Sequence, residues 1–297
     1  MIFLFKPLKL TITFLQTCKN QLKTLITMLN KKNALITGGA GLLGPQHAIA
    51  LNELGFNIIL LDINKIKLLI AYNKLKKKLK KNTKIFYYEC DISSETQVKK
   101  VALDLKKKNF LIDVLVNNAD MNPKMEKYKN SYTGRVEDYS IDLLTKEISV
   151  GVIGTFICSK IFGEHMKIKK KGSIINVSSD LGIIAPDQRV YHKSEDIKKV
   201  RHFKPIGYSI SKHAIIGITK YLSTYWANKN IRCNTLVPGA VFNNQPKFLI
   251  KNVMKRIPLN RWAKSTEYKK AIQFLATDDS CYMTGQSLIM DGGRTVW

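Results

Sequence analysis

The segment NALITGGAGLLG, residues 33–44, contains the features that decide the fold. Ala34–Thr37 form a short apolar run of strand type, and a glycine-rich turn follows it directly. Helical periodicity then begins at Pro45 and ends at Gly55. Glycines in a strand-to-helix turn let the backbone approach a pyrophosphate, and the helix N-terminus offers amide hydrogens and its dipole to the phosphates. The segment therefore predicts the phosphate-binding turn of a dinucleotide-binding α/β fold.

Short apolar runs alternate with amphipathic stretches along the rest of the chain. We expect strands at 34–37, 57–62, 85–88, 112–117, 173–178, 231–237 and 287–290, and helices at 45–55, 65–81, 94–108, 136–169, 208–228 and 266–277. This pattern is typical of a Rossmann-type, doubly wound parallel sheet of about seven strands with helices on both faces. The stretches 120–135 and 180–207 interrupt it after strands, at the sheet edge where such folds bind ligands. We expect one domain over residues 31–297.

Residues 1–30 precede this domain and differ from it in composition. They are apolar and basic, and no acidic residue occurs before Glu53. They lack the clean apolar core and the small-residue cleavage site of a secretory signal. Two interpretations stay open: an N-terminal extension, disordered or used in targeting, or a misassigned start, with the true chain beginning at Met28.

The 297-residue chain is strongly basic, with 49 basic and 22 acidic residues and a formal net charge of +27. Only seven of the basic residues are Arg, although phosphate forks and base readout in nucleic acids favour Arg. The lysines fall on expected solvent faces of helices, as Lys74, Lys76 and Lys77 do, with few aromatic residues among them. We therefore expect no nucleic acid partner, although the charge should attract anionic substrates and cofactors.

The five cysteines, at positions 18, 90, 158, 233 and 281, have neither metal-ligand nor redox spacing. Free thiols are typical of a reducing compartment, so we expect a cytoplasmic protein without a bound metal. No apolar run is long enough to span a bilayer, which argues against stable membrane insertion.

Asp62 ends the second expected strand, 18 residues after Gly44. A carboxylate at this place can accept hydrogen bonds from both ribose hydroxyls of NAD, and it would repel the 2′-phosphate of NADP. We therefore expect NAD as the cofactor, with NADP less favoured but kept open by the nearby Lys65. The alternative is an Asp that merely caps the end of a strand.

Later segments resemble, in order along residues 33–297, the signatures of the short-chain dehydrogenase/reductase family. Asn117-Asn118-Ala119 is similar to the family's Asn-Asn-Ala-Gly motif. The other similar segments are Cys90-Asp91-Ile92, Asn234, Pro238-Gly239, Tyr282-Met283-Thr284-Gly285-Gln286 and Asp291-Gly292-Gly293. The resemblance implies a cofactor site made of Thr37, Gly38, Gly41, Leu43, Gly44, Asp62, Asp91, Ile92, Asn118, Ala119, Tyr208, Lys212, Pro238 and Gly239.

The Tyr-x-x-x-Lys spacing of Tyr208 and Lys212 places both side chains on one helix face. The same spacing occurs at Tyr72/Lys76 and at Tyr225/Lys229. Of these three tyrosines, however, Tyr208 is the first to follow the fifth expected strand and its pair of serines. The resemblance implies that Tyr208, Lys212 and Ser179 are catalytic, with Ser179 favoured over Ser178 because Asp180-Leu181-Gly182 follows it.

These residue types suit the oxidation of a secondary alcohol or the reduction of a ketone. A tyrosine titrates near about pH 10 and is a poor base at neutral pH. A lysine cation beside Tyr208 favours the phenolate, and Lys212 can also hold the nicotinamide ribose. Ser179 would donate a hydrogen bond to the substrate oxygen as charge develops there, while the cofactor carries the hydride.

The chain departs from the family pattern at several positions. Gly151 aligns with the helix Asn that is the fourth catalytic member, and that Asn holds a relay water mainly through its main-chain carbonyl. Gly151 keeps a carbonyl, and a helix distortion is easier at glycine. Elsewhere Leu42 replaces the middle glycine of the turn, Asp120 ends the Asn-Asn-Ala motif, and Asn243 aligns with an expected Thr. These departures indicate a distinct subgroup.

Ser179 and Tyr208 lie 29 positions apart, whereas the family usually separates them by about a dozen. The added residues, in the 183–207 loop, carry more cations than anions. We therefore expect an anionic or sugar-like small molecule as substrate, bound by Ser179, Arg189 and Tyr208. None of the five His residues has metal-ligand spacing.

The substrate subgroup is suggested by three further segments, which resemble oxidoreductases of bacterial surface-sugar pathways such as flagellin modification and nonulosonate synthesis. They are Gly41–Ala48, Ala185–Tyr191 and Arg294–Trp297. A 3-oxoacyl-acyl-carrier-protein reductase is the alternative enzyme, and a non-catalytic dinucleotide-binding sensor is the alternative of another class. The family resemblance also implies a homodimer or homotetramer, and long amphipathic helices could pair across a symmetry axis.

Overall fold

A parallel sheet of seven strands, in the order β3-β2-β1-β4-β5-β6-β7, runs through the computed structural model, which describes residues 31–121, 134–192 and 202–297. The strands are β1 (Asn33–Thr37), β2 (Asn57–Asp62), β3 (Ile85–Glu89), β4 (Val114–Asn117), β5 (Gly172–Val177), β6 (Ile231–Pro238) and β7 (Ser287–Met290). The expected Rossmann-type sheet is confirmed, and every adjacent pair is parallel. The extension proposed for residues 1–30 lies outside the described residues.

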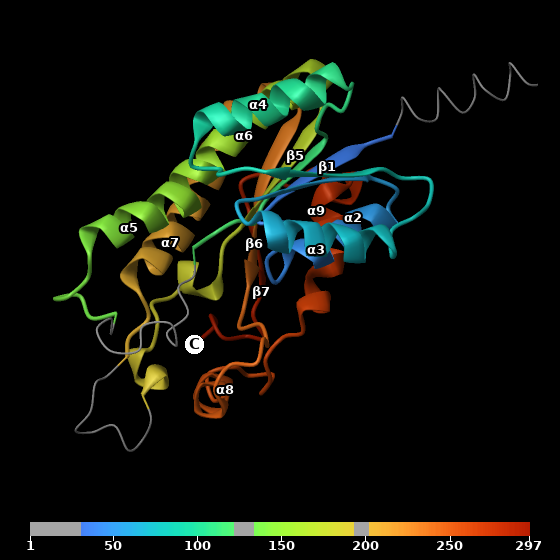
Figure 1. Cartoon of the computed structure of the whole chain (residues 1–297). Coiled ribbons are helices and arrows are strands. Elements are labelled where there is room, and N and C mark those ends of the chain that lie inside the picture. Colours follow the sequence, from blue (N-terminus) through green and yellow to red (C-terminus); the bar gives the residue numbers. More distant parts are fainter. Residues whose placement is uncertain (1–30, 122–133, 193–201) are drawn as a thin grey trace, which may run out of the picture. The chain divides into compact units, whose positions relative to one another are not determined.

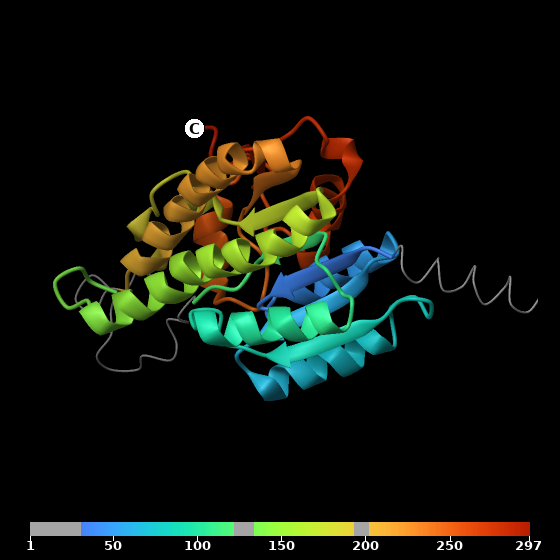
Figure 2. The ribbon, with the colours of Figure 1, turned by 90° about the horizontal axis from the view of Figure 1, so that it is seen from above.

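Helices cover both faces of this sheet (Figure 1). The α-helices are α2 (Gly44–Glu53), α3 (Lys65–Lys76), α4 (Glu95–Lys107), α5 (Ile141–Ile148), α6 (Thr155–Lys169), α7 (Ile206–Tyr225), α8 (Lys247–Met254) and α9 (Lys269–Ala276). One apolar core packs α4, α6 and α7 against the sheet. A second core packs α2, α3 and α9 against the other face. Seen from above, α5 and α7 lie side by side (Figure 2).

The strand order reverses direction between β1 and β4. From β1 the chain builds outward to β2 and β3, and it then returns to add β4 on the opposite side. The loops at the carboxyl ends of β1 and β4 therefore diverge, and open α/β sheets bind ligands in the crevice at such a switch point.

The helix expected over residues 136–169 is wrong in its start and in its continuity. Helix α5 begins at Ile141, where Ser140 accepts a hydrogen bond from the Leu143 amide as an N-cap. A π-helix, η2 (Ser149–Gly154), separates α5 from α6. Such bulges are rare and are often found at functional sites, and this one contains Gly151.

Helix α8 was not expected from the sequence. It has only eight residues, and it follows Pro246, a residue type that usually marks the end of a helix or strand in a sequence. Its residue Val253 packs with Val190 and Tyr191 in a small third apolar cluster. This cluster forms one wall of the region beyond the carboxyl ends of β5 and β6.

Within the described ranges, no helix is both long and apolar enough to cross a membrane. The same residues contain no group of three or more His, Cys, Asp or Glu side chains arranged to hold a metal ion.

Candidate active site

A cavity of about 1800 Å³ opens at the carboxyl edge of the sheet. Loops that follow six successive strands contribute to its lining, from the turn after β1 to the segment after β6. Among its lining residues are the sequence-predicted Gly38, Gly41, Leu43, Asp62, Asp91, Ile92, Asn118, Ala119, Ser179, Tyr208, Lys212, Pro238 and Gly239. The structure thus brings together residues that lie up to 201 positions apart.

The glycine turn after β1 has no room for side chains at several of its positions, of which Gly38 and Gly44 are closest to backbone atoms. Gly38 has a φ of +62°, and a Cβ atom there would lie 2.8 Å from the Ala119 Cα. A Cβ on Gly44 would lie 2.4 Å from the Gly38 carbonyl oxygen. By contrast, the side chain of Leu42, which replaces the family's middle glycine, is exposed. The turn therefore tolerates that departure.

Thr37 and Asn118 lock the glycine turn to the loop after β4. The Thr37 hydroxyl oxygen accepts hydrogen bonds from the amides of Asn118 and Ala119, both at 3.0 Å. The Asn118 side-chain amide donates to the carbonyl oxygens of Thr37 and Gly38, at 3.0 and 3.1 Å. Thr37 itself is fully buried, so its role is to shape the turn and not to line the cavity.

The Asp62 carboxylate faces the cavity from the end of β2. One of its oxygens accepts a hydrogen bond from the Ala40 amide at 3.0 Å, and the other accepts one from Asn64 at 3.0 Å. Each carboxylate oxygen has a further lone pair for a ligand hydroxyl. The nearby Lys65 forms an ion pair with Glu89 at 3.7 Å, so its charge is already engaged away from Asp62.

Tyr208 and Lys212 lie one turn apart at the start of α7, which begins directly after Pro205. The Lys212 ammonium lies 5.5 Å from the centre of the Tyr208 ring. It donates to the Val177 carbonyl oxygen at 3.0 Å and forms an ion pair with Asp120 at 2.9 Å. Ser179 lies close enough to Tyr208 to influence the pKa of its phenol, and its hydroxyl donates to the Asp180 carboxylate at 2.7 Å. These three side chains therefore converge on one point of the cavity.

Ser178, Tyr72 and Tyr225, the alternatives to Ser179 and Tyr208, are engaged in contacts away from the point where Tyr208 and Lys212 meet. The Ser178 hydroxyl donates to the Lys212 carbonyl oxygen at 2.7 Å, which ties β5 to α7. Tyr72 contacts the ring of Tyr87, and Tyr225 is exposed and stacks on Tyr221. Neither of those tyrosines lines the cavity.

The electrostatic environment of Tyr208 differs from the one expected from Lys212 alone. Burial raises the pKa of Tyr208, and the negative charge of Asp120 raises it further. The interaction with Ser179 acts in the opposite direction and lowers the pKa of Tyr208. The net pKa shift is upward, and burial is its largest cause. Tyr208 is therefore set to hold its proton at neutral pH.

Two cations near Tyr208 were not assigned to the site from sequence. The Lys204 ammonium lies 3.7 Å from the centre of the Tyr208 ring, and burial lowers the pKa of Lys204 to about 8. Arg294 donates to the Asp180 carboxylate at 2.8 Å, and both side chains are about 95% buried. The sequence does not single out Lys204, because its loop contains many other cations. It gives no signal for Arg294 either, because the C-terminal segment that contains it suggests a subgroup and not a contact.

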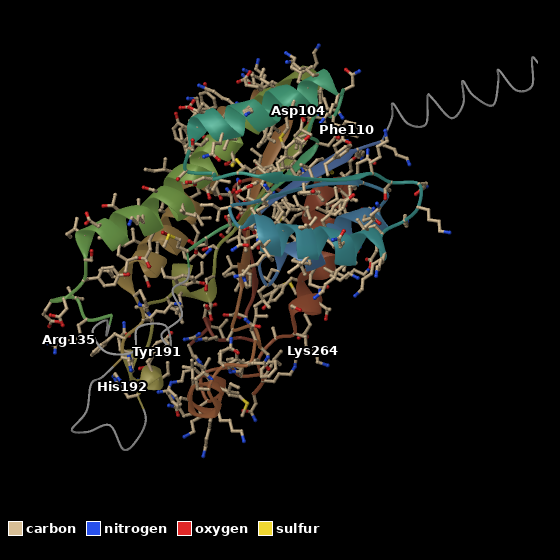
Figure 3. The ribbon with its side chains drawn as sticks, viewed as in Figure 1. Asp104, Phe110, Arg135, Tyr191, His192 and Lys264 are labelled. Atoms are coloured by element: carbon tan, nitrogen blue, oxygen red, sulfur yellow. The ribbon has the colours of Figure 1, made fainter. Side chains whose placement is uncertain are left out.

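Arg189, predicted to bind substrate, does not line the cavity. Its side chain is 83% exposed and donates to Asp187 at 2.8 Å. Asp187 also accepts hydrogen bonds from Arg256. The sequence could not reveal that this aspartate holds Arg189 outward. Tyr191, two residues later, does line the cavity, from the 3-10 turn Gln188–Tyr191 (Figure 3).

Gly151 lies behind the cavity wall, buried within η2. Its carbonyl oxygen accepts a hydrogen bond from the Thr155 hydroxyl at 2.8 Å. Gly44 likewise lies behind the lining residues, where it starts α2. Both residues therefore shape the site without facing it.

Comparison with known proteins agrees with this arrangement. The sequence profile of the family described as "Enoyl-(Acyl carrier protein) reductase" matches residues 41–295. A 3-oxoacyl-[acyl-carrier-protein] reductase of Thermotoga maritima is 30% identical, over 90% of this chain and 99% of the relative. A 2-dehydro-3-deoxy-D-gluconate 5-dehydrogenase of Bacillus subtilis is 28% identical, over 89% of this chain and 95% of the relative.

Among solved structures, a short-chain dehydrogenase from Leptospira borgpetersenii with bound NAD+ superposes with a TM-score of 0.76. It is 28% identical, and the match covers 89% of this chain and 93% of that one. The match of a family profile over most of the chain, the similar folds and the ordered motifs lead to one conclusion. The chain belongs to the short-chain dehydrogenase/reductase family of oxidoreductases.

Proposed function

We propose that this protein interconverts a secondary alcohol and a ketone by hydride transfer with NAD(H). The observation that carries the proposal is the convergence of Tyr208, Ser179 and Lys212 in the cavity that also contains the glycine turn and Asp62. When bound, the nicotinamide supplies or accepts the hydride. The protein positions the substrate and moves the accompanying proton.

The glycine turn fits the pyrophosphate of a dinucleotide. Added Cβ atoms at Gly38 and Gly44 would collide with backbone atoms at 2.8 and 2.4 Å, so only glycine keeps this surface open. The turn leads into the N-terminus of α2, whose amides and dipole favour phosphate. Asp62 would hold the adenine-side ribose, and its negative charge favours NAD over NADP.

In ketone reduction Tyr208 donates the proton and Ser179 donates a hydrogen bond to the same carbonyl oxygen. Burial raises the pKa of Tyr208, which keeps the phenol protonated until the oxygen acquires negative charge. Lys212 would hold the nicotinamide ribose beside them when the cofactor is bound. In the oxidative direction Tyr208 accepts the proton instead.

The substrate is proposed to be a polar anion of the sugar or sugar-acid class. Lys204, His202 and Lys247 line the cavity together with Asn243 and Asn244, and these side chains can donate hydrogen bonds to carboxylate, phosphate or hydroxyl groups. The B. subtilis relative is named for its action on 2-dehydro-3-deoxy-D-gluconate. The T. maritima relative keeps an acyl thioester as the second candidate substrate.

The test is a turnover assay with NADH or NADPH and two groups of carbonyl substrates. One group contains keto-sugar acids, sugar nucleotides and amino-sugar derivatives, and the other contains acetoacetyl thioesters. Lys204→Met should raise KM for the anionic sugars at least about tenfold, whereas Arg189→Met, outside the cavity, should leave it unchanged. Turnover of the thioester alone, unaffected by Lys204→Met, would refute the sugar assignment.

A further inference from the structure

Two positions at which the chain departs from its family pattern, Asp120 and Gly151, touch each other. Asp120 follows β4, and Gly151 lies inside η2, 31 positions later. A Cβ atom built on Gly151 would lie 2.8 Å from the Asp120 Oδ1 and 2.9 Å from the Ser211 side chain. The Asp120 carboxylate therefore occupies space that a side chain at position 151 would need.

The same carboxylate is the charged partner of Lys212. Its Oδ2 lies 2.9 Å from the Lys212 Nζ, with the two side chains 9% and 5% exposed. Among the described residues, neither Asp120 oxygen has a hydrogen-bond partner of good geometry. The negative charge of Asp120 is therefore offset mainly by the positive charges of Lys212 and Lys204. A buried carboxylate with no such compensation would be strongly destabilising. Removing either Asp120 or Lys212 would therefore leave the other charge buried without its partner.

The main-chain carbonyl of Gly151 is bound within its own helical segment and not by Lys212. It accepts a hydrogen bond from the Thr155 hydroxyl at 2.8 Å, within the same helical segment. Lys212, for its part, reaches the Val177 carbonyl oxygen and the Asp120 carboxylate. The only negatively charged group paired with Lys212 among the described residues is Asp120.

We propose that Asp120 is a positioning residue of the oxidoreductase reaction, holding the Lys212 ammonium and offsetting its charge at Tyr208. Gly151 is the paired substitution that makes room for the carboxylate. The inference rests on the proposed function. Its consequence is that Tyr208 stays protonated and is suited to donate a proton, which is the step that ketone reduction requires.

The other charged groups around Tyr208 do not remove this effect. Asp180 and Arg294 are paired with each other at 2.8 Å and largely cancel. Glu147, on α5, is buried and accepts a hydrogen bond from Tyr139 at 2.6 Å, and burial raises the pKa of Glu147. Glu147 acts on Asp120 and Lys204. The titratable and charged groups around Tyr208 itself are Lys204, Tyr191, Lys212 on α7, Asp120, Asp180 on η3 (Asp180–Gly182) and Arg294.

The steric half of the proposal is tested without any substrate. The wild type, Asp120→Gly, Gly151→Ala and the double variant are compared by thermal unfolding and by NADH titration. Gly151→Ala alone should lower Tm, and removing the carboxylate in the double variant should recover at least about 2–4 °C of that loss. Equal loss from Gly151→Ala in both backgrounds would show that the two positions are independent.

The electrostatic half is tested by the pH dependence of alcohol oxidation, which rises as Tyr208 loses its proton. Asp120→Asn removes the negative charge, so the pKa of Tyr208 should fall and the rising limb should move about one unit to lower pH. The matched control is Asp142→Asn, an exposed carboxylate in the first turn of α5, whose profile should superimpose on that of the wild type.

An Asp120→Asn profile identical to that of the wild type would overturn the proposal. Absence of turnover by the wild-type protein with every carbonyl and alcohol tested would refute the proposed function instead. In that case the Tm coupling would still decide whether Asp120 and Gly151 are paired, so the two failures are distinguishable.

Discussion

Replacing Arg294 with Met should destabilise the protein strongly, because it leaves a buried carboxylate without its cation. Arg294 and Asp180 lie 2.8 Å apart, with side chains 5% and 4% exposed. Asp180 also accepts hydrogen bonds from the Ser179 hydroxyl at 2.7 Å and from the Leu181 amide at 2.8 Å. The perturbation therefore acts on the segment that positions a proposed catalytic residue.

The size of the effect follows from this burial. Breaking a buried pair by removing one partner costs about 3–5 kcal/mol. At roughly 2–4 °C for each kcal/mol in a domain of this size, Tm should fall by about 6–20 °C.

The assay is thermal unfolding at neutral pH, followed by circular dichroism. Arg189→Met is the matched control, because the Arg189 pair with Asp187 is exposed and should contribute less than about 1 kcal/mol. The double variant Asp180→Asn/Arg294→Met should recover much of the loss. A Tm for Arg294→Met within about 2 °C of the wild type would refute the electrostatic reasoning.

Three further predictions concern the cofactor, the substrate and the assembly. Asp62→Ser should improve NADPH binding relative to NADH at least about tenfold, measured by fluorescence titration, whereas tighter NADPH binding by the wild type would contradict the role of Asp62. KM for an anionic substrate should rise above about pH 8, where Lys204 loses its charge; Lys204→Met should abolish that rise, and persistence of the rise would exclude Lys204. Light scattering should give a homodimer or homotetramer, since Phe156 on α6 and Tyr221 on α7 are exposed apolar side chains; a monomer at micromolar concentration would count against it.

The sheet could be predicted from sequence because each of its strands is a short apolar run bounded by turn residues. The expected bounds of β2 (57–62) and β7 (287–290) coincide with the observed ones. The glycine turn could also be predicted, since strand, glycines and helix follow one another in order. Boundaries within 136–169 could not, because a π-helix has no distinct periodicity and the Ser140 cap lies inside a continuous amphipathic pattern.

The residues of the site could be predicted where a motif fixes their place relative to a strand. Tyr208 can be distinguished from Tyr72 and Tyr225 only because it is the first of the three to follow the fifth strand. Sequence could not tell which cation reaches the cavity, because Arg189 is held outward by Asp187 while Lys204 turns inward. Partners that meet only in the folded chain, as Arg294 and Asp180 do, leave no signal in local spacing.

The most direct test of the central claim compares Tyr208→Phe with Tyr225→Phe. Both variants lose one phenolic hydroxyl, but only Tyr208 lines the cavity. The account predicts that Tyr208→Phe lowers NADH-dependent turnover by at least about 100-fold while NADH still binds with nearly unchanged affinity. It predicts that Tyr225→Phe is close to the wild type in both measurements. Full turnover by Tyr208→Phe, or an equal loss in Tyr225→Phe, would contradict the assignment of Tyr208 as the residue that moves the proton.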